Sequence, residues 1–331
     1  MDLVSLGDIR AAQRRIAGVA VRTPLLPAGW AGDGERRLYV KPEMLQPIGA
    51  FKIRGAYNKI ARLTPEERAR GVIGSSSGNH AQALAYAAAR FGSKATVVMP
   101  ETAPAHKVDA TRALGAHIIV VPPAERDVLP VELAEEHGYV LVPPYDDPDI
   151  IAGQGTVGAE IAEDLPDVEL VLVPVSGGGL ISGIAAAVKA LRPAARIVGV
   201  EPSLAGDAAE SFQRGERLVW EPERTYRTIA DGLRTTSVGV LPWRHIQAYV
   251  DDIVTVTDDQ IRQAMREIAV ESRLVAEPSG AVAAAAYLFA QDRLPKAART
   301  VAVLSGGNVS PTLLAEILLS PGVHGRANAA G

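Results

Sequence analysis

The stretch KPEMLQPIGAFKIRGAYN, residues 41–58, places a single lysine, Lys52, at a predicted boundary between two structural elements. The apolar residues 38–40 lead into it as a strand, a turn with proline and glycine follows, and a helix is predicted after Phe51. A side chain at such a boundary can be held rigidly and still point into a cleft. Most lysines are simply solvated, so the rest of the chain must decide whether Lys52 is functional.

Two further segments are rich in small residues, SSSGNH at residues 75–80 and SGGGL at residues 176–180. Each follows a short apolar run and precedes a helical pattern. A strand, a small-residue turn and a helix in this order expose backbone N–H groups at a helix N-terminus, where an anion binds. Neither segment matches the dinucleotide pattern G-x-G-x-x-G or the P-loop. The sequence therefore predicts a phosphate that is bound outside those two nucleotide motifs.

The composition narrows the class of protein. The chain has 331 residues, of which 47% are hydrophobic and 22% charged, so it can bury a large core. A net charge of −4 argues against a nucleic-acid surface. The lack of cysteine excludes disulfides, thiolate catalysis and a cysteine zinc site. Without a signal-peptide pattern or an apolar run of about 18 residues, we expect a soluble, cytoplasmic protein.

Apolar runs alternate with helical patterns along most of the chain, as expected for parallel α/β layers. A cluster of prolines and aspartates at residues 143–148 separates two such series and precedes a long predicted helix, 150–164. The strand candidates are residues 72–73, 95–99, 117–121, 139–142, 170–175, 197–200, 253–256 and 300–304.

Four motifs together carry a family resemblance: GAFKIRGAYN (49–58), SSSGNHAQA (75–83), VPVSGGGL (173–180) and LSGGN (304–308). In this order and separation, the chain resembles the pyridoxal-phosphate (PLP) enzymes of fold type II. Within them it is most similar to the serine racemase and serine/threonine dehydratase family. The similarity extends from about residue 19 to about residue 314.

The resemblance implies an α/β fold with two open, mostly parallel twisted sheets flanked by helices, like the β subunit of tryptophan synthase. It implies a small domain, residues 70–146, inserted into a large PLP-binding domain formed by residues 1–69 and 147–331. The active site would lie between the two lobes, where ligand sites are common. Members of the family are commonly dimers, so a homodimer is expected.

The resemblance assigns Lys52 the role of the Schiff-base lysine. An amine in a partly desolvated site has a lowered pKa and becomes a usable nucleophile and base. Serine at position 176 replaces the fourth glycine of the family's phosphate loop, where its backbone is less free. The full set of residues implied to bind PLP is Phe51, Lys52, Asn79, Ser176, Gly177, Gly178, Gly179, Leu180 and Ser305.

Ser305 matches the family's partner of the pyridine nitrogen. A hydroxyl does not stabilise a protonated pyridinium, so the ring would be a weaker electron sink. This favours β-elimination or proton return at Cα over transamination. Taken alone, residues 305–308 also fit a plain strand-to-helix turn with an N-cap.

Ser77 separates two possible activities. In the family, a serine here faces the side of the substrate opposite the lysine and exchanges a proton with Cα, as two-base racemisation requires. Serine before Gly-Asn-His at a helix start is also ordinary capping chemistry. Ser77 therefore permits racemisation, and amino-acid racemisation as the main activity stays open.

The segment EPSLAGD, residues 201–207, matches the family's divalent-cation loop. Glu201, Asp207 and the carbonyl of Ala205 would give hard oxygen ligands to Mg²⁺, or to Mn²⁺ or Ca²⁺. Without the resemblance, this spacing indicates no more than two solvated carboxylates.

The substrate carboxylate is expected at the helix N-terminus that follows strand 72–73. The residues assigned to the substrate are Ser76, Ser77, Asn79, His80, Arg126 and Ser237. Arg126 also fits a solvated polar run. Tyr145 replaces an asparagine of animal serine racemases, and Ala50 replaces the more usual serine before Phe-Lys, so the substrate is left open.

The expected activity is a PLP-dependent serine/threonine dehydratase, an ammonia-lyase. Lys52 would remove the Cα proton and the β-hydroxyl would leave, giving pyruvate from L-serine or 2-oxobutanoate from L-threonine, with ammonia. Return of a proton by Ser77 would give the D-amino acid instead. A 3-hydroxyaspartate dehydratase is an alternative, and a cysteine-synthase type of enzyme is disfavoured by its different motifs. A non-catalytic amino-acid-binding module is the alternative from another class.

Overall fold

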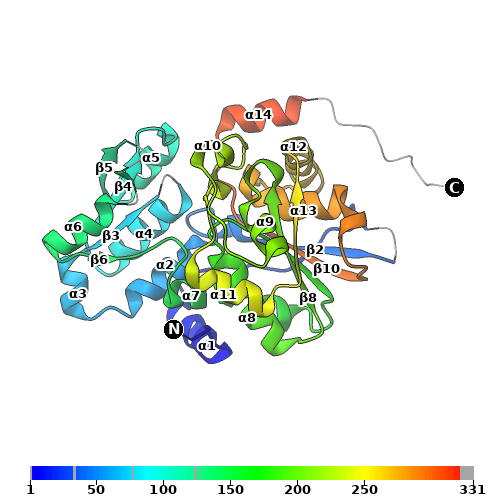
Figure 1. Cartoon of the computed structure of the whole chain (residues 1–331), viewed down its shortest axis with the longest axis horizontal. Coiled ribbons are helices and arrows are strands. Elements are labelled where there is room, and N and C mark those ends of the chain that lie inside the picture. The colour runs from blue at the N-terminus through cyan, green and yellow to red at the C-terminus, as the bar shows by residue number, and fades with distance from the viewer. Residues whose placement is uncertain (1, 33–34, 77, 123–124, 127, 321–331) are drawn as a thin grey trace.

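The computed structural model describes residues 2–32, 35–76, 78–122, 125–126 and 128–320 and contains two sheets (Figure 1). The larger sheet has six strands in the order β1-β2-β10-β7-β8-β9, and the smaller has four in the order β5-β4-β3-β6. All pairs are parallel except the antiparallel pair β1–β2. The prediction of two mostly parallel sheets flanked by helices is confirmed.

The six-stranded sheet is buried on both faces, as is usual when helices cover both sides of a parallel sheet. Leu170 and Leu172 of its central strand β7 pack in the cluster that includes helix α13, whereas Val171 and Val173 pack in the cluster that includes α8. This alternation explains the continuous apolar run of the strand. The strands are β1 Leu26–Pro27, β2 Arg37–Pro42, β7 Leu170–Pro174, β8 Arg196–Pro202, β9 Asp252–Val256 and β10 Arg299–Leu304.

Helices on the two sides of this sheet come from distant parts of the chain. The apolar face of α13 covers one side together with α12, and α8 covers the other side beside α7. The bounds are α7 Pro148–Asp164, α8 Gly179–Leu191, α11 Val240–Tyr249, α12 Asp258–Glu267 and α13 Pro278–Phe289.

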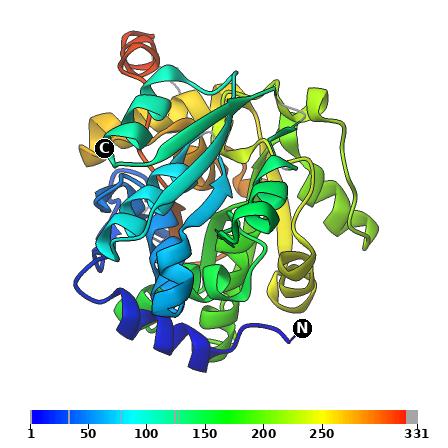
Figure 2. The ribbon, with the colours of Figure 1, turned by 90° about the vertical axis from the view of Figure 1, so that its left-hand side faces the viewer.

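The four-stranded sheet takes all its strands from one continuous part of the chain. The cyan and teal part of the ribbon, which faces the viewer in Figure 2, carries it together with its helices. Its elements are α3 Pro65–Arg70, β3 Val72–Ser75, α4 Asn79–Arg90, β4 Ala95–Pro100, α5 Ala105–Ala113, β5 His117–Val121, α6 Leu129–His137 and β6 Val140–Leu141. The predicted domain boundaries at residues 70 and 146 stay a prediction.

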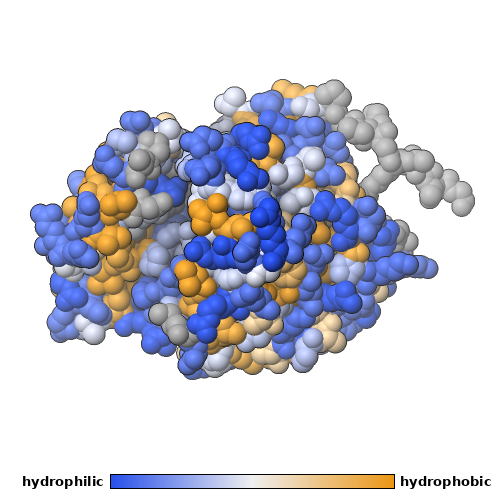
Figure 3. All heavy atoms as spheres, viewed as in Figure 1, coloured by the Kyte–Doolittle hydropathy of each residue, from blue (hydrophilic) through white to orange (hydrophobic). Residues whose placement is uncertain are grey.

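Helix α2, Lys52–Ala61, joins the two parts, because it packs against α4 on one side and α7 on the other. Figure 3 shows a mostly hydrophilic face that is hollowed between the part with the four-stranded sheet and the remainder. Of the helices in the described ranges, none is both long and apolar enough to cross a membrane. The remaining elements are α1 Leu6–Ile16, η1 Glu43–Leu45, η3 Ser203–Ala205, α9 Asp207–Arg214, α10 Pro222–Thr225, η4 Asp231–Leu233, η5 Ile268–Ser272, η6 Gln291–Arg293 and α14 Pro311–Leu319.

Candidate active site

Lys52 is the first residue of α2 and is partly buried. Its Nζ donates a hydrogen bond to the carbonyl of Pro144 at 2.7 Å and lies 5.2 Å from the centre of the Phe51 ring. Burial lowers the pKa of the Lys52 ammonium group to about 8. More of the amine is therefore neutral near physiological pH than for an ordinary lysine, and the neutral amine is the state that a base or nucleophile needs.

The segment before Lys52 is tied to the end of β10. The backbone N–H of Phe51 donates to the carbonyl of Ser305 at 3.1 Å, and that of Gly307 donates to the carbonyl of Gly49 at 2.9 Å. Gly49 has φ of +70°, a conformation that favours glycine. Two motifs more than 250 residues apart therefore form one backbone unit, which places Lys52 close to Ser305.

The glycine loop links β7 to the N-terminus of α8, where the first N–H groups of the helix have no carbonyl one turn earlier. Gly178 has φ of +89°. A Cβ on Gly177 would lie 2.2 Å from the ring of Tyr145, and one on Gly179 would lie 2.9 Å from the Tyr145 Cβ. Bare backbone is therefore required here, and the loop offers N–H groups to an anion such as phosphate.

Ser176 and Ser305 sit at the carboxyl ends of neighbouring strands, β7 and β10. The hydroxyl of Ser176 is 2.9 Å from that of Thr235. Ser305 is buried, and its hydroxyl donates to the carbonyl of Ser279 at 3.4 Å. The two serines, the glycine loop and Lys52 thus meet at one edge of the six-stranded sheet, as expected for parallel strands.

Asn79 begins α4 and reaches across to residues of the larger sheet's side. Its Nδ2 donates to Glu277 Oε1 at 2.5 Å, and its Oδ1 accepts from Asn308 Nδ2 at 2.8 Å. Asn308 also donates to the carbonyl of Ile48 at 2.9 Å. Because one partner only accepts and the other donates, the Asn79 amide is fixed in orientation.

The other predicted substrate residues near the start of α4 differ in what they contact. Ser77 lies outside the described residues. Ser76 Oγ accepts from the N–H of Gly78 at 3.1 Å, so this serine shapes the turn before α4. The His80 ring is buried, and its Nε2 lies 2.8 Å from the carbonyl oxygen of Val142. Burial and the charge of Lys52 lower the pKa of His80 to about 3, so the ring is neutral.

Arg126 and Ser237 lie in loops. Arg126 is partly buried in the segment after β5. Ser237 Oγ accepts from Arg217 at 2.8 Å and donates to the carbonyl of Val238 at 3.1 Å. Arg217 was not among the predicted residues, and nothing in its local sequence distinguishes it from a solvated arginine.

The predicted metal ligands form a buried carboxylate pair, Glu201 and Asp207. Glu201 accepts from the N–H groups of Ala208 at 3.3 Å and Ala209 at 2.8 Å. Neither Asp207 side-chain oxygen has a hydrogen-bond partner among the described residues. Burial raises the pKa of both groups, that of Asp207 to about 7, and the nearby Asp207 charge adds to the rise for Glu201.

The carboxylate pair has the chemistry of a cation site, because unsatisfied buried carboxylate oxygens are costly without a positive partner. Ala205, which supplies the third predicted ligand, is buried in the short turn between them. Within the described ranges, however, no three His, Cys, Asp or Glu side chains gather around a common centre. Any bound ion would therefore depend on backbone carbonyls and water for its remaining ligands.

A second set of buried charges was missed by sequence reasoning. We call it the α2 network: Lys41, Glu43, Arg54 and Glu160, all at most 4% exposed. Arg54 Nε lies 2.8 Å from Glu43 Oε2, and its Nη1 lies 2.6 Å from Glu160 Oε1. Lys41 Nζ lies 2.7 Å from Glu160 Oε2. The network clamps α2, and with it Lys52, onto α7.

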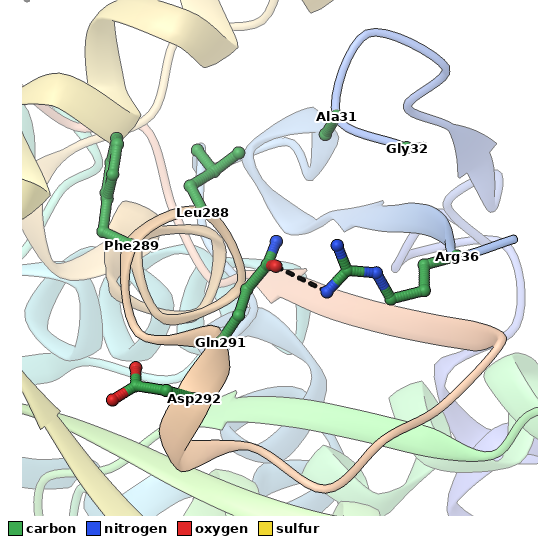
Figure 4. Close-up of a pocket in the computed structure, with 7 residues that line it drawn as sticks. All are labelled: Ala31, Gly32, Arg36, Leu288, Phe289, Gln291 and Asp292. Atoms are coloured by element: carbon green, nitrogen blue, oxygen red, sulfur yellow. Dashed lines mark hydrogen bonds between the residues drawn. The ribbon is translucent and has the colours of Figure 1, made fainter. Parts of the chain in front are cut away.

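A cavity away from Lys52 has a volume of about 470 Å³ and lies beside the C-terminal end of α13 (Figure 4). Ser279, the neighbour of Ser305, is at the other end of this helix, roughly 15 Å away at about 1.5 Å per residue. None of the predicted site residues is among those that line it, which are Ala31, Gly32, Arg36, Leu288, Phe289, Gln291 and Asp292.

A desolvated lysine facing a glycine loop at a helix N-terminus, on a parallel α/β fold, defines a class of enzyme that uses a lysine-bound, phosphate-bearing cofactor. The family model described as pyridoxal-phosphate dependent enzyme matches residues 16–306. The chain therefore belongs to this family of PLP-dependent enzymes.

Three similar proteins represent the branches of the family that this chain resembles in sequence and structure. An L-threonine ammonia-lyase of Thermotoga maritima is 42% identical over 96% of this chain and 78% of that protein. An L-threo-3-hydroxyaspartate ammonia-lyase of Saccharomyces cerevisiae is 41% identical over 93% of this chain and 94% of that protein. The solved structure of maize serine racemase has a TM-score of 0.90 and 39% identity, covering 95% of this chain and 97% of that one.

Proposed function

We propose that this protein is an ammonia-lyase that converts L-threonine to 2-oxobutanoate and L-serine to pyruvate, with release of ammonia. The observation that carries the proposal is the Lys52 amine: burial lowers its pKa to about 8, and the preceding residue, Phe51, is hydrogen-bonded to the Ser305 carbonyl. The similarity to an L-threonine ammonia-lyase over 96% of this chain supports the choice of reaction.

The residues present fit PLP. The glycine loop has no room for side chains beside Tyr145 and Pro242, so its backbone stays bare, and the N-terminus of α8 favours the charge of a phosphate. Lys52 would carry the cofactor, Asn79 and Phe51 would flank its ring, and Ser305 would face its nitrogen. When bound, PLP withdraws electrons from the amino acid and makes its Cα proton acidic.

Once the substrate's amino group has taken its place on the cofactor, the freed Lys52 amine would act as the base. It would take the Cα proton and pass a proton to the β-hydroxyl, which would leave as water. The resulting enamine hydrolyses after release, so that L-threonine gives one 2-oxobutanoate and one ammonia with no net water consumed. The neutral Ser305 hydroxyl would favour this elimination over transamination.

Racemisation is a competing outcome that rests on Ser77 as a second base. The 39% identity to a serine racemase supports keeping it as a second candidate. A proton returned to Cα by Ser77 would give the D-amino acid from the same carbanion.

For 3-hydroxyaspartate, the site would need a cation that reads the second carboxylate. His80 is neutral and hydrogen-bonded to Val142, so it offers no charge. Only Arg126, of the predicted substrate residues, could do so. This favours neutral β-hydroxy amino acids, although a yeast relative is named for the hydroxyaspartate reaction.

We further propose that Glu201, Asp207 and the Ala205 carbonyl bind Mg²⁺, with Mn²⁺ or Ca²⁺ as substitutes. The unsatisfied Asp207 oxygens support this site. A homodimer in the cytoplasm remains our proposal for the assembly and location, and analytical ultracentrifugation would test the assembly.

The test is to incubate the PLP-loaded protein and Mg²⁺ with L-threonine, L-serine and L-threo-3-hydroxyaspartate in parallel. We expect 2-oxo acid and ammonia in equal amounts from the first two substrates. D-serine in excess of pyruvate would instead establish racemisation as the main activity. Turnover of the hydroxyaspartate alone would contradict the proposed substrate class, and Arg126→Ala would then be expected to abolish it.

A further inference from the structure

Lys107 is a buried lysine that bridges the two parts of the molecule. It belongs to α5 beside the four-stranded sheet and is only 4% exposed. Its Nζ lies 2.5 Å from Asp231 Oδ2 in η4 and 3.7 Å from Glu277 Oε2 at the start of α13. Both carboxylates are on the side of the six-stranded sheet. A buried lysine is costly unless it is paired, so this arrangement is built for those two partners.

Glu277 connects Lys107 to the candidate active site. Its Oε1 accepts from Asn79 Nδ2 at 2.5 Å, while its Oε2 faces Lys107 and has no hydrogen bond among the described residues. A Cβ on Gly78, the residue before Asn79, would lie 3.3 Å from Lys107 Cδ. The lysine therefore touches the turn that precedes Asn79 as well as the carboxylate that holds it.

The orientation of Asn79 depends on the charge of Glu277. An ionised carboxylate only accepts hydrogen bonds, so it selects the NH₂ end of the amide. A protonated carboxyl group can also donate, so it would no longer select that end, and of the described partners only Asn308 Nδ2 would orient the amide. The charged groups that face Glu277 are Lys107 from α5 and Asp231 from η4. Burial raises the pKa of Glu277, Lys107 opposes the rise, and Asp231 adds to it.

We propose that Lys107 is a positioning residue of this enzyme: it keeps Glu277 ionised, and Glu277 in turn fixes the Asn79 amide that flanks the cofactor ring. The role of Asn79 beside the cofactor rests on the proposed function. Because the bridge spans both parts of the molecule, it forms only when α5 lies close to η4 and α13. Cofactor binding and approach of the two parts are thereby coupled.

The first experiment measures the PLP dissociation constant of the apoprotein by equilibrium dialysis from pH 6 to pH 9. Lys107→Met removes the charge with most of the side-chain length retained, and Lys107→Arg keeps the charge. We expect Lys107→Met to weaken PLP binding about tenfold at pH 6, which corresponds to a rise of about one unit in the pKa of Glu277. The loss should become progressively smaller toward pH 9. Lys107→Arg should stay within about threefold of the parent. An equal loss at every pH would overturn the proposal.

The second experiment is a double-mutant cycle with Glu277→Gln, which cannot ionise. If Lys107 acts through Glu277, Lys107→Met adds no further loss of PLP affinity in the Glu277→Gln background. Losses that multiply would assign Lys107 a merely structural role and refute the proposal. These binding readouts are independent of the substrate. If the protein binds PLP as expected but forms no 2-oxo acid, the proposed function is wrong and the positioning role of Lys107 is still supported.

Discussion

Two buried groups of charged side chains in this molecule differ in whether their negative charges are matched by positive ones. The α2 network sets two cations against two carboxylates, and each is hydrogen-bonded. The carboxylate pair of Glu201 and Asp207 has backbone donors on one member only. Charges that are mutually satisfied serve the fold, whereas charges left unsatisfied need a partner from outside the chain.

The pKa values express the same contrast. In the α2 network, burial disfavours the charge of Glu43, but Arg54 and Lys41 outweigh it and lower the pKa of the carboxyl group. In the carboxylate pair, burial dominates and raises the pKa of both groups. Burial alone therefore does not separate a structural group from a ligand site; the presence of an internal counter-charge does.

The largest loss of stability is expected when Arg54 is replaced. Arg54→Met leaves two buried carboxylates with only Lys41 between them, so we expect the free energy of unfolding to fall by about 3–5 kcal/mol. Urea unfolding followed by circular dichroism measures it. Added Mg²⁺ should stabilise the parent protein and the variant equally and leave the difference between them unchanged. A smaller difference in the presence of Mg²⁺ would show that the network is also a cation site.

The metal-free protein should lose stability as the pH rises. The pKa of Asp207 is about 7 in the folded protein and 3.8 in the unfolded chain. Between pH 3.8 and pH 7, the folded state therefore binds one more proton than the unfolded state. The stabilisation is present below pH 4 and is lost as the pH passes through 7, by up to about 4 kcal/mol. Unfolding in chelator from pH 5 to pH 8 tests this, with Asp207→Asn as the control in which the slope is reduced. A stability that rises over this range would contradict it.

Mg²⁺ should remove that pH dependence and stabilise the protein. At a concentration of one hundred times its dissociation constant, a ligand of the folded state adds about 2.7 kcal/mol. Thermal unfolding with and without Mg²⁺ at pH 8 measures the gain, and Mn²⁺ and Ca²⁺ rank the ion. Asp207→Asn should lose most of the gain. An equal gain in that variant would place the ion elsewhere.

The smallest effect is expected from an exposed ion pair. Arg112 and Asp109 lie 2.8 Å apart but are 60% and 72% exposed. Arg112→Met should change the free energy of unfolding by less than about 0.5 kcal/mol. This variant is the matched control for Arg54→Met, because it makes the same substitution outside the core. A loss near that of Arg54→Met would mean that burial and balance do not set the effect.

The parts of the fold that follow from local patterns could be predicted. The predicted helix 150–164 is Pro148–Asp164, and the predicted strand 139–142 is the shorter Val140–Leu141. The meeting of Lys52, the glycine loop and Ser305 was implied by the family resemblance, and it agrees with the rule that turns after parallel strands gather at one edge of a sheet.

The contacts between distant segments could not be read from the sequence. Lys107 and Asp231 are 124 residues apart and lie in segments that look polar and solvated. Arg54 and Glu160 are 106 residues apart, and neither residue shows by itself that it is buried. The tertiary packing decides both, since a charge is buried only where its partner is already in place. The hydrogen bond between the His80 ring and the carbonyl of Val142 likewise could not be predicted from the pattern of a helix start.

The most direct test of the central claim is the rate of 2-oxobutanoate formation from L-threonine by the PLP-loaded parent protein and by Lys52→Ala. The account predicts equal amounts of 2-oxobutanoate and ammonia from the parent protein, and a rate in the variant at least about 10³-fold lower, because the base is gone. The parent kcat should rise with pH toward the Lys52 pKa near 8, because kcat reports the groups that act in the substrate complex. A Lys52→Ala variant that keeps its rate within tenfold would contradict the account.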